Sequence, residues 1–265
     1  MRWPTFALLL GLSLPSAGIA DTPNPLVLVA GATGATGQLV VALLQDKGLS
    51  VRGLVRDPSK ANENLSSGVD WVVGDARDPA SLESAFDGVT HAVSTIGSRM
   101  RSGPNSFEFV DWEGNRNLID AAKAAGVAHF VLMTSGSAGI GSLDDAMSQR
   151  FGAGRIWKGK AESHLRESQL SYTIVAPGGL RNYPGGEKDI ILKSRRDYTI
   201  GAIARGDVAS VIVECLFNAA CAGKTITVVN ADTAGAAWRE NLSLVPADTP
   251  DTITGTYQQL ERSLP

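Results

Sequence analysis

The stretch LVLVAGATGATG at residues 26–37 decides the fold of this chain. Five apolar residues run without interruption and then meet glycines, which is typical of a strand buried on both faces of a parallel sheet. Residues 39–44 repeat apolar side chains at helical spacing, and Gly48 stands where a helix commonly ends. The pattern therefore predicts a strand, a glycine-rich turn and a helix.

The turn has the chemistry of a phosphate site. Its three glycines lack the Cβ atoms that would keep a ligand from the backbone, and the amides of the first helical turn bind anions with the helix dipole behind them. This spacing after a strand predicts that the turn holds the linked phosphates of a dinucleotide, and a tight turn without a ligand is the alternative. The residues expected at the pyrophosphate are Gly31, Thr33, Gly34, Ala35, Thr36 and Gly37.

The alternation of strand and helix continues to about residue 230. Parallel neighbours need crossover connections, so this order predicts an α/β fold, a Rossmann-like doubly wound and mostly parallel sheet of six or seven strands with helices on both faces. The further strands are expected at 51–55, 71–73, 91–96, 130–133, 172–176 and 225–229, and the further helices at 79–86, 110–122, 158–167 and 207–216.

The end of the second strand distinguishes the two nicotinamide nucleotides. An acidic residue there would bind the ribose 2′-hydroxyl of NAD, whereas a cation pairs with the 2′-phosphate of NADP. The chain has Arg56 at this point and Lys60 one helical turn later, although Asp57 stands between them. Because arginine can fork onto a phosphate and stack on adenine, the sequence predicts NADP(H) as the cofactor. Solvated loop charges are the alternative.

The ends of the third and fourth strands are expected to contact the adenine and the nicotinamide ribose of such a cofactor. Asp75 and Ala76 follow the third strand and are expected beside the adenine, with an acidic surface turn as the alternative. Thr95 and Ile96 end the fourth strand and are expected beneath the nicotinamide ribose. Both assignments depend on the predicted topology.

The first twenty residues have a different character. Arg2, an apolar run over residues 6–14 and the small residues before Asp21 predict a secretory signal peptide. We therefore divide the chain into a signal peptide at 1–20, an NAD(P)-binding domain at 21–230 and a peripheral C-terminal extension at 231–265. An exported, periplasmic protein with no stable membrane insertion follows from cleavage, and a membrane-tethered or organellar protein is the alternative.

Composition limits the partners. A net charge of -3 gives no electrostatic reason to expect nucleic acid, so we expect a small-molecule acceptor and a monomer or homodimer. The three histidines do not form a metal constellation. The two cysteines, Cys215 and Cys221, are expected to be buried small side chains rather than a disulfide.

Several motifs taken together resemble the atypical short-chain dehydrogenase/reductases, in particular the NmrA-like, NAD(P)-binding group that includes the flavin and biliverdin-IXβ reductases. The resemblance covers about residues 26–230. It implies one Rossmann-like domain, NADP(H) as cofactor and a nicotinamide ring between the ends of the fourth and fifth strands and the Pro177 loop. The motifs are VAGATGATG at 29–37, LVRDP at 54–58, VGD at 73–75, GNRNL at 114–118, AAGV at 124–127, LRES at 165–168 and YTIVAPGG at 172–179.

The resemblance is weakest at the catalytic residues. Relatives with carbonyl chemistry use a serine, and a tyrosine four residues before a lysine, where the tyrosine donates the proton. Here Ser135 and Lys158 are retained and are expected near the nicotinamide, but Gly154 occupies the tyrosine position. Two functions remain open: a reductase that passes hydride to a flavin, quinone or similar acceptor, and a non-catalytic redox sensor or assembly factor. For Lys158, an exposed helical face paired with Glu162 is the alternative.

Overall fold

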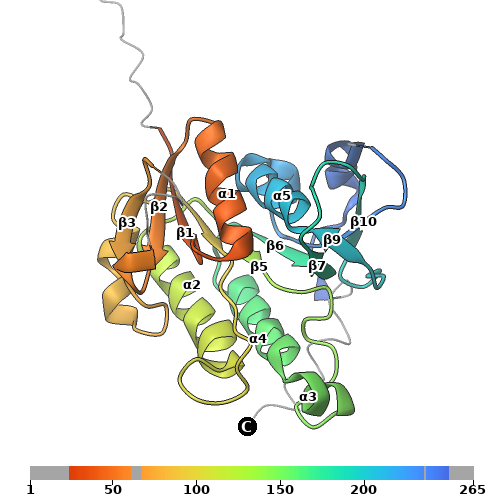
Figure 1. Cartoon of the computed structure of the whole chain (residues 1–265), viewed down its shortest axis with the longest axis horizontal. Helices are drawn as coiled ribbons and strands as arrows, with labels where there is room; N and C mark the ends of the chain where they lie inside the picture. Colours follow the sequence, from red (N-terminus) through yellow and green to blue (C-terminus); the bar gives the residue numbers. More distant parts are fainter. Residues whose placement is uncertain (1–23, 61–66, 236, 251–265) are drawn as a thin grey trace, which may run out of the picture.

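The computed structural model describes residues 24–60, 67–235 and 237–250, so the expected signal peptide lies outside the described residues. Eight strands form the main sheet in the order β3-β2-β1-β4-β5-β6-β10-β8 (Figure 1). Seven of them are parallel, and β8 pairs with β10 in the antiparallel direction. The strands are β1 (Leu26–Ala30), β2 (Ser50–Val55), β3 (Asp70–Val73), β4 (His91–Ser94), β5 (His129–Met133), β6 (Tyr172–Pro177), β8 (Ile190–Ser194) and β10 (Lys224–Asn230).

This topology confirms the predicted doubly wound fold. β1 lies between β2 and β4, so the strand order reverses beside it and leaves a crevice at the carboxyl ends of the strands. The antiparallel edge strand β8 was not predicted. A separate two-stranded sheet of β7 (Gly179–Arg181) and β9 (Ala202–Ala204) was not predicted either.

Helices cover both faces of the sheet. α1 (Ala35–Asp46) and α5 (Arg205–Phe217) pack on one face, and α2 (Asn115–Ala124) and α4 (Gly154–Glu167) pack on the other (Figure 1). Alternate residues of β1 enter the two cores: Val27 and Val29 face α1 and α5, and Leu28 faces the opposite layer. None of the helices in the described residues has the length and hydrophobicity of a transmembrane span.

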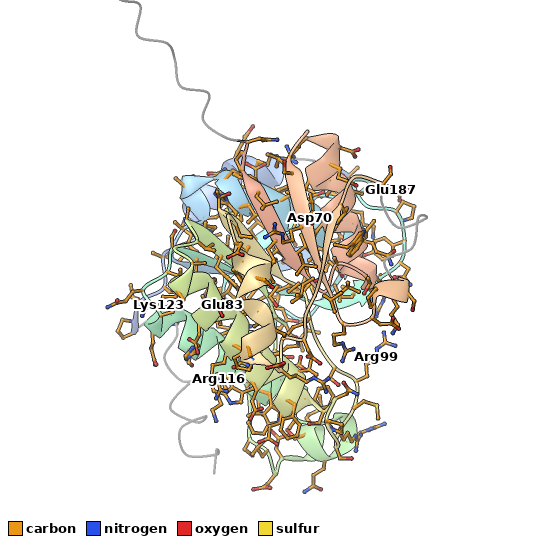
Figure 2. The ribbon with its side chains drawn as sticks, turned by 90° about the vertical axis from the view of Figure 1, so that its left-hand side faces the viewer. Asp70, Glu83, Arg99, Arg116, Lys123 and Glu187 are labelled. Atoms are coloured by element: carbon orange, nitrogen blue, oxygen red, sulfur yellow. A yellow bond between two sulfur atoms is a disulfide. The ribbon has the colours of Figure 1, made fainter. Side chains whose placement is uncertain are left out.

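The remaining helical segments are short. The predicted helix at 79–86 is two 3-10 turns, and a π-helix precedes α2. Glu83, between the two 3-10 turns, and Lys123 on α2 are exposed on the side of the molecule shown in Figure 2. The short segments are α3 (Ala146–Phe151), η1 (Pro58–Lys60), η2 (Pro79–Leu82), η3 (Ser84–Phe86), the π-helix η4 (Glu108–Gly114), η5 (Ala219–Cys221) and η6 (Ala237–Leu244).

The segment after β10 corrects one expectation. Residues 231–250 were expected to be peripheral, but Trp238, Leu242 and Val245 are buried in the core that α1 and α5 share. Trp238 and Leu242 are the buried residues of η6, and Val245 directly follows it. So short a segment carries too few apolar positions to show a clear periodicity in the sequence.

The cysteine prediction was wrong. Cys215 and Cys221 are buried as expected, but they form a disulfide. α5 ends at Phe217 and η5 turns the chain back, which brings the two Cα atoms to 5.3 Å. A continuous helix would have kept them apart, and the sequence pattern did not reveal its break. Disulfides of this kind persist mainly in oxidising compartments.

His129 makes the stability of the sheet depend on pH. It begins β5, and its ring nitrogens lie 2.8 Å from Ser171 Oγ and 3.0 Å from Thr173 Oγ1. Burial lowers the pKa of His129 to about 4, with a further contribution from His91. Because an unfolded histidine has a pKa of about 6.5, the unfolded chain binds the proton first as the pH falls. The contribution of neutral His129 is therefore complete above pH 6.5 and is lost toward pH 4.

We predict that this group lowers the free energy of unfolding by roughly 3 kcal/mol between pH 7 and pH 4, at about 1.4 kcal/mol per pH unit. Urea unfolding of the wild type and His129→Gln across this range measures the effect. The variant should lose less stability than the wild type as the pH falls, since all other titrating groups are shared. Parallel stability curves would contradict the assignment.

Candidate active site

A cavity opens at the carboxyl ends of the first four strands, where the strand order reverses. Eight of the residues predicted from the sequence lie on its wall, and they come from four separate strand ends. They are Gly31, Thr33, Gly34, Arg56, Asp75, Ala76, Thr95 and Ile96. The other predicted residues lie next to this wall or deeper in the fold, as described below.

The glycine turn is held by contacts that exclude side chains. Gly31 has φ +84°, and a Cβ there would lie 2.7 Å from Thr95 Oγ1. Gly34 donates its backbone N–H to the Gly31 carbonyl at 2.8 Å. A Cβ on Gly37 would lie 2.0 Å from the same carbonyl oxygen, so only glycine lets α1 begin this close to β1. Gly31 and Gly37 are thus explained by backbone shape and helix packing.

The start of α1 is open to an anion. Ala35, Thr36 and Gly37 form its first turn and do not line the cavity, and Thr36 is buried. The N-cap residue Gly34 has no side chain to cap the helix, and the first turn contains no acidic residue. The first amides of a helix lack intrahelical partners, and no side chain satisfies them here through a cap.

Two arginines gather at the β2 and β3 end of the cavity. Arg77, which the sequence analysis did not single out, donates from Nε to Asp75 Oδ1 at 2.9 Å. This hydrogen bond holds the pKa of Asp75 below its usual value. Arg56 Nη1 and Arg77 Nη1 donate to the same oxygen, Asn105 Oδ1, at 2.9 and 3.1 Å. The predicted cation therefore has a second beside it, and Lys60 does not line the cavity.

Lys158 lies at the opposite end, beside the terminus of β4. Its Nζ is 2.5 Å from Oδ1 of Asp111, a carboxylate with no exposed surface. Oδ2 of the same residue accepts the Ser98 backbone N–H at 2.9 Å. A Cβ on Gly97, a cavity residue, would lie 3.1 Å from Lys158 Nζ. Lys158 is therefore fixed toward the cavity by Asp111, and not by Glu162.

The carboxylate that holds Lys158 is itself supported from β4. Asn115 donates from Nδ2 to the Asp111 carbonyl at 2.9 Å, and Ser94 Oγ donates to Asn115 Oδ1 at 2.6 Å. Asp111 belongs to the π-helix and Asn115 to α2, so the wider helical turn lets both face the strand end. Asp111 is one of three acidic residues in the segment Glu108–Gly114, and nothing in the sequence distinguished it from the other two.

Ser135 and Pro177 lie beyond the cavity wall, at the ends of β5 and β6. Ser135 Oγ is 3.2 Å from Ser137 Oγ, and Gly136 donates its backbone N–H to the Pro177 carbonyl at 2.7 Å. The loop after β5 therefore holds two hydroxyl groups and is tied to the neighbouring strand.

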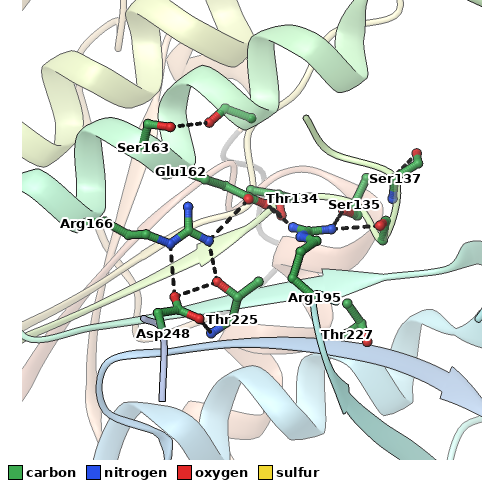
Figure 3. A network of polar contacts seen from close by, with 12 residues as sticks. Thr134, Ser135, Ser137, Glu162, Ser163, Arg166, Arg195, Thr225, Thr227 and Asp248 are labelled. Atoms are coloured by element: carbon green, nitrogen blue, oxygen red, sulfur yellow. Dashed lines mark hydrogen bonds and ion pairs between the residues drawn. The ribbon is translucent and has the colours of Figure 1, made fainter. Parts of the chain in front are cut away.

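A buried ionic network supports this loop from behind (Figure 3). Arg195 donates from Nη1 to the carbonyls of Ser135 and Gly136, at 2.7 Å each, and pairs through Nη2 with Glu162. Glu162 also accepts from Thr134 Oγ1 at 2.5 Å and pairs with Arg166 at 3.4 Å. This occupies Glu162 fully and explains why it does not serve Lys158.

The same network extends to the C-terminal segment. Arg166 Nε pairs with Asp248 Oδ2 at 2.9 Å, and Thr225 on β10 donates its backbone N–H and its hydroxyl to that carboxylate. Residue 248 is thereby joined through α4 to the loop after β5. Within the described residues, no group of three or more His, Cys, Asp and Glu side chains is placed to hold a metal ion.

Comparisons with known proteins agree with this geometry. A family described as NAD(P)H-binding matches residues 31–219. Sanguinarine reductase of Eschscholzia californica is 34% identical over 242 residues, covering 75% of this chain and 86% of that protein. The photosystem II assembly factor Ycf39 of Trieres chinensis is 33% identical over 153 residues, covering 58% of this chain and 45% of that protein. The solved structure of the oxidoreductase ylbE from Lactococcus lactis superposes with a TM-score of 0.69 and 26% identity, over 83% and 95% of the two chains.

Proposed function

This chain belongs to the NAD(P)H-binding family, within its atypical short-chain dehydrogenase/reductase and NmrA-like branch, and on that premise we propose that it is an NADPH-dependent oxidoreductase. The acceptor is a small molecule such as a flavin, a quinone or a carbonyl compound. One arrangement supports the proposal: the start of α1 lies between the paired arginines at the ends of β2 and β3 and Lys158 beside the cavity residue Gly97, which is the order of adenosine, phosphates and nicotinamide in a dinucleotide.

The preference for NADPH rests on charge. Arg56 and Arg77 bring two positive charges to the adenosine end against one from Asp75, so a 2′-phosphate there meets a net cationic site. Asn105 holds both guanidinium groups in place before the phosphate arrives. NADH lacks this phosphate and therefore forms no ion pair with either arginine.

We predict that Arg56→Ala and Arg77→Ala each weaken NADPH binding about ten- to hundredfold, because each loses a hydrogen bond to a charged phosphate. NADH binding should stay within about twofold of the wild type. Calorimetric titration of both nucleotides measures this. Lys123→Ala removes the same charge from an exposed site on α2 and should change neither affinity. Equal affinity of the wild type for NADPH and NADH would refute the role of the arginines.

The nicotinamide end supports hydride transfer. When bound there, the reduced nicotinamide supplies a hydride. Lys158, held by Asp111, lies beside Gly97 and can donate hydrogen bonds to a ribose hydroxyl, which fixes the distance between the reactive groups. Ser135 stands at the next strand end, where an acceptor would lie. We assign catalysis mainly to this positioning.

We expect the purified full chain to oxidise NADPH, followed at 340 nm, with at least one of FMN, riboflavin, a quinone and a simple aldehyde. Lys158→Met should lower turnover with that acceptor because the ribose loses its donor. Lys160→Met should not, because Lys160 lies two residues later on a different face of α4, over the rings of Trp112 and Trp157. Tight NADPH binding without oxidation in the presence of any acceptor would reject the reductase.

A second candidate function is a non-catalytic redox sensor or assembly factor, in which the nucleotide state alters a partner surface. Gly154 at the tyrosine position favours it, as does the similarity to an assembly factor. The NADPH oxidation assay distinguishes the two, since a sensor binds the nucleotide and does not consume it.

A further inference from the structure

The proposed reductase lacks an acid where relatives keep one. A carbonyl or quinone that receives a hydride leaves negative charge on its oxygen, and a donor must supply a proton there. Gly154 cannot do so. Tyr183 already donates its hydroxyl proton to Asn230 Oδ1 at 2.9 Å and is 38% exposed, so it is a poor proton donor for an acceptor.

A different tyrosine reaches the loop after β5. The ring tip of Tyr198 lies on Gly136: a Cβ built on that glycine would be 2.3 Å from Cζ and 2.7 Å from the hydroxyl oxygen. The residue directly after Ser135 is thus a glycine whose missing side chain leaves room for this phenol. Tyr198 is 44 chain positions from Gly154, and it comes to the strand end where an acceptor would lie.

Tyr198 is held there by the turn that carries it. Arg195, three residues earlier, donates to the carbonyls of both Ser135 and Gly136, which ties the turn to the loop. Ser194 Oγ donates to Asp197 Oδ2 at 2.5 Å, and Thr227 on β10 donates its hydroxyl to the Lys193 carbonyl at 3.0 Å. The phenol is therefore placed before any acceptor binds.

The surroundings suit a proton donor. The Tyr198 hydroxyl makes no hydrogen bond to another described residue, which leaves its proton available to a ligand. Burial raises the pKa of Tyr198, so the phenol stays protonated at neutral pH, and the positive charge of Arg195 acts in the opposite direction. The same charge stabilises the phenolate that forms when the proton leaves.

We propose that Tyr198 is the general acid of this protein, a catalytic residue that protonates the oxygen of a carbonyl or quinone acceptor; this rests on the proposed reductase function. As the hydride forms a C–H bond at the acceptor carbon, the C=O π electrons take the phenolic proton of Tyr198. NADPH is oxidised to NADP⁺, the carbonyl is reduced to an alcohol, and water returns a proton to the phenolate.

The test compares two acceptors that differ in their need for a proton. Reduction of 9,10-phenanthrenequinone requires one at oxygen, whereas N-methylacridinium, a cationic iminium, becomes neutral on receiving hydride alone. Tyr198→Phe should lower the quinone rate about 100-fold or more, within the usual range for a general acid, and leave the acridinium rate and the NADPH affinity within about twofold. The control Tyr183→Phe should change none of these quantities.

A binding measurement adds a readout that does not require turnover. In protein labelled with ¹³C at the tyrosine Cζ and saturated with NADP⁺, the resonance missing from Tyr198→Phe should shift when the quinone is added. An unmoved resonance, an equal loss with both acceptors in Tyr198→Phe, or a wild type that reduces only the acridinium would overturn the assignment and leave the reductase standing. A wild type that binds NADPH and reduces neither acceptor would overturn the reductase and this assignment together.

Discussion

The structure depends on the contact between the Gly31 carbonyl and the first turn of α1. A side chain at Gly37 would overlap that oxygen, so the helix can begin this close to β1 only with glycine there. The close start brings the N-terminus of α1 to the crevice beside β1, where the strand order reverses and where Thr33 and Gly34 line the cavity. One packing requirement therefore explains both the glycine at this position and the opening that a linked pair of phosphates needs.

The two ends of the crevice are built by different physical means. At the proposed adenosine end, Asn105 holds the exposed Arg56 and the half-buried Arg77, and Arg77 also pairs with Asp75, which leaves an excess of one positive charge for an anion. At the nicotinamide end, the ammonium of Lys158 is balanced by a fully buried carboxylate, so the group is fixed in direction and partly neutralised. The first arrangement suits recognition of charge, and the second suits precise placement of a donor.

Much of the fold was predictable because fully buried parallel strands are read as continuous apolar runs, and the glycine turn has a spacing that few other structures need. The antiparallel β8 and the disulfide could not be predicted, because both depend on where the chain turns back and the sequence pattern does not show these turns. Arg77 and Tyr198 were missed for the same reason. Arg77 is held by Asn105, 28 positions away in the chain, and Tyr198 packs on Gly136, 62 positions away. Sequence patterns locate strand ends well, but not the loops that fold over them.

Amide shifts of the uniformly ¹⁵N-labelled protein during titration with NADP⁺ test the central claim most directly, because each backbone N–H of the glycine turn reports its own hydrogen bond. The account predicts that Ala35, Thr36 and Gly37 show some of the largest shift changes in the chain and that they saturate together with the residues around Arg56. If the nucleotide binds while these three amides keep their free positions, the phosphates lie elsewhere and the account is contradicted.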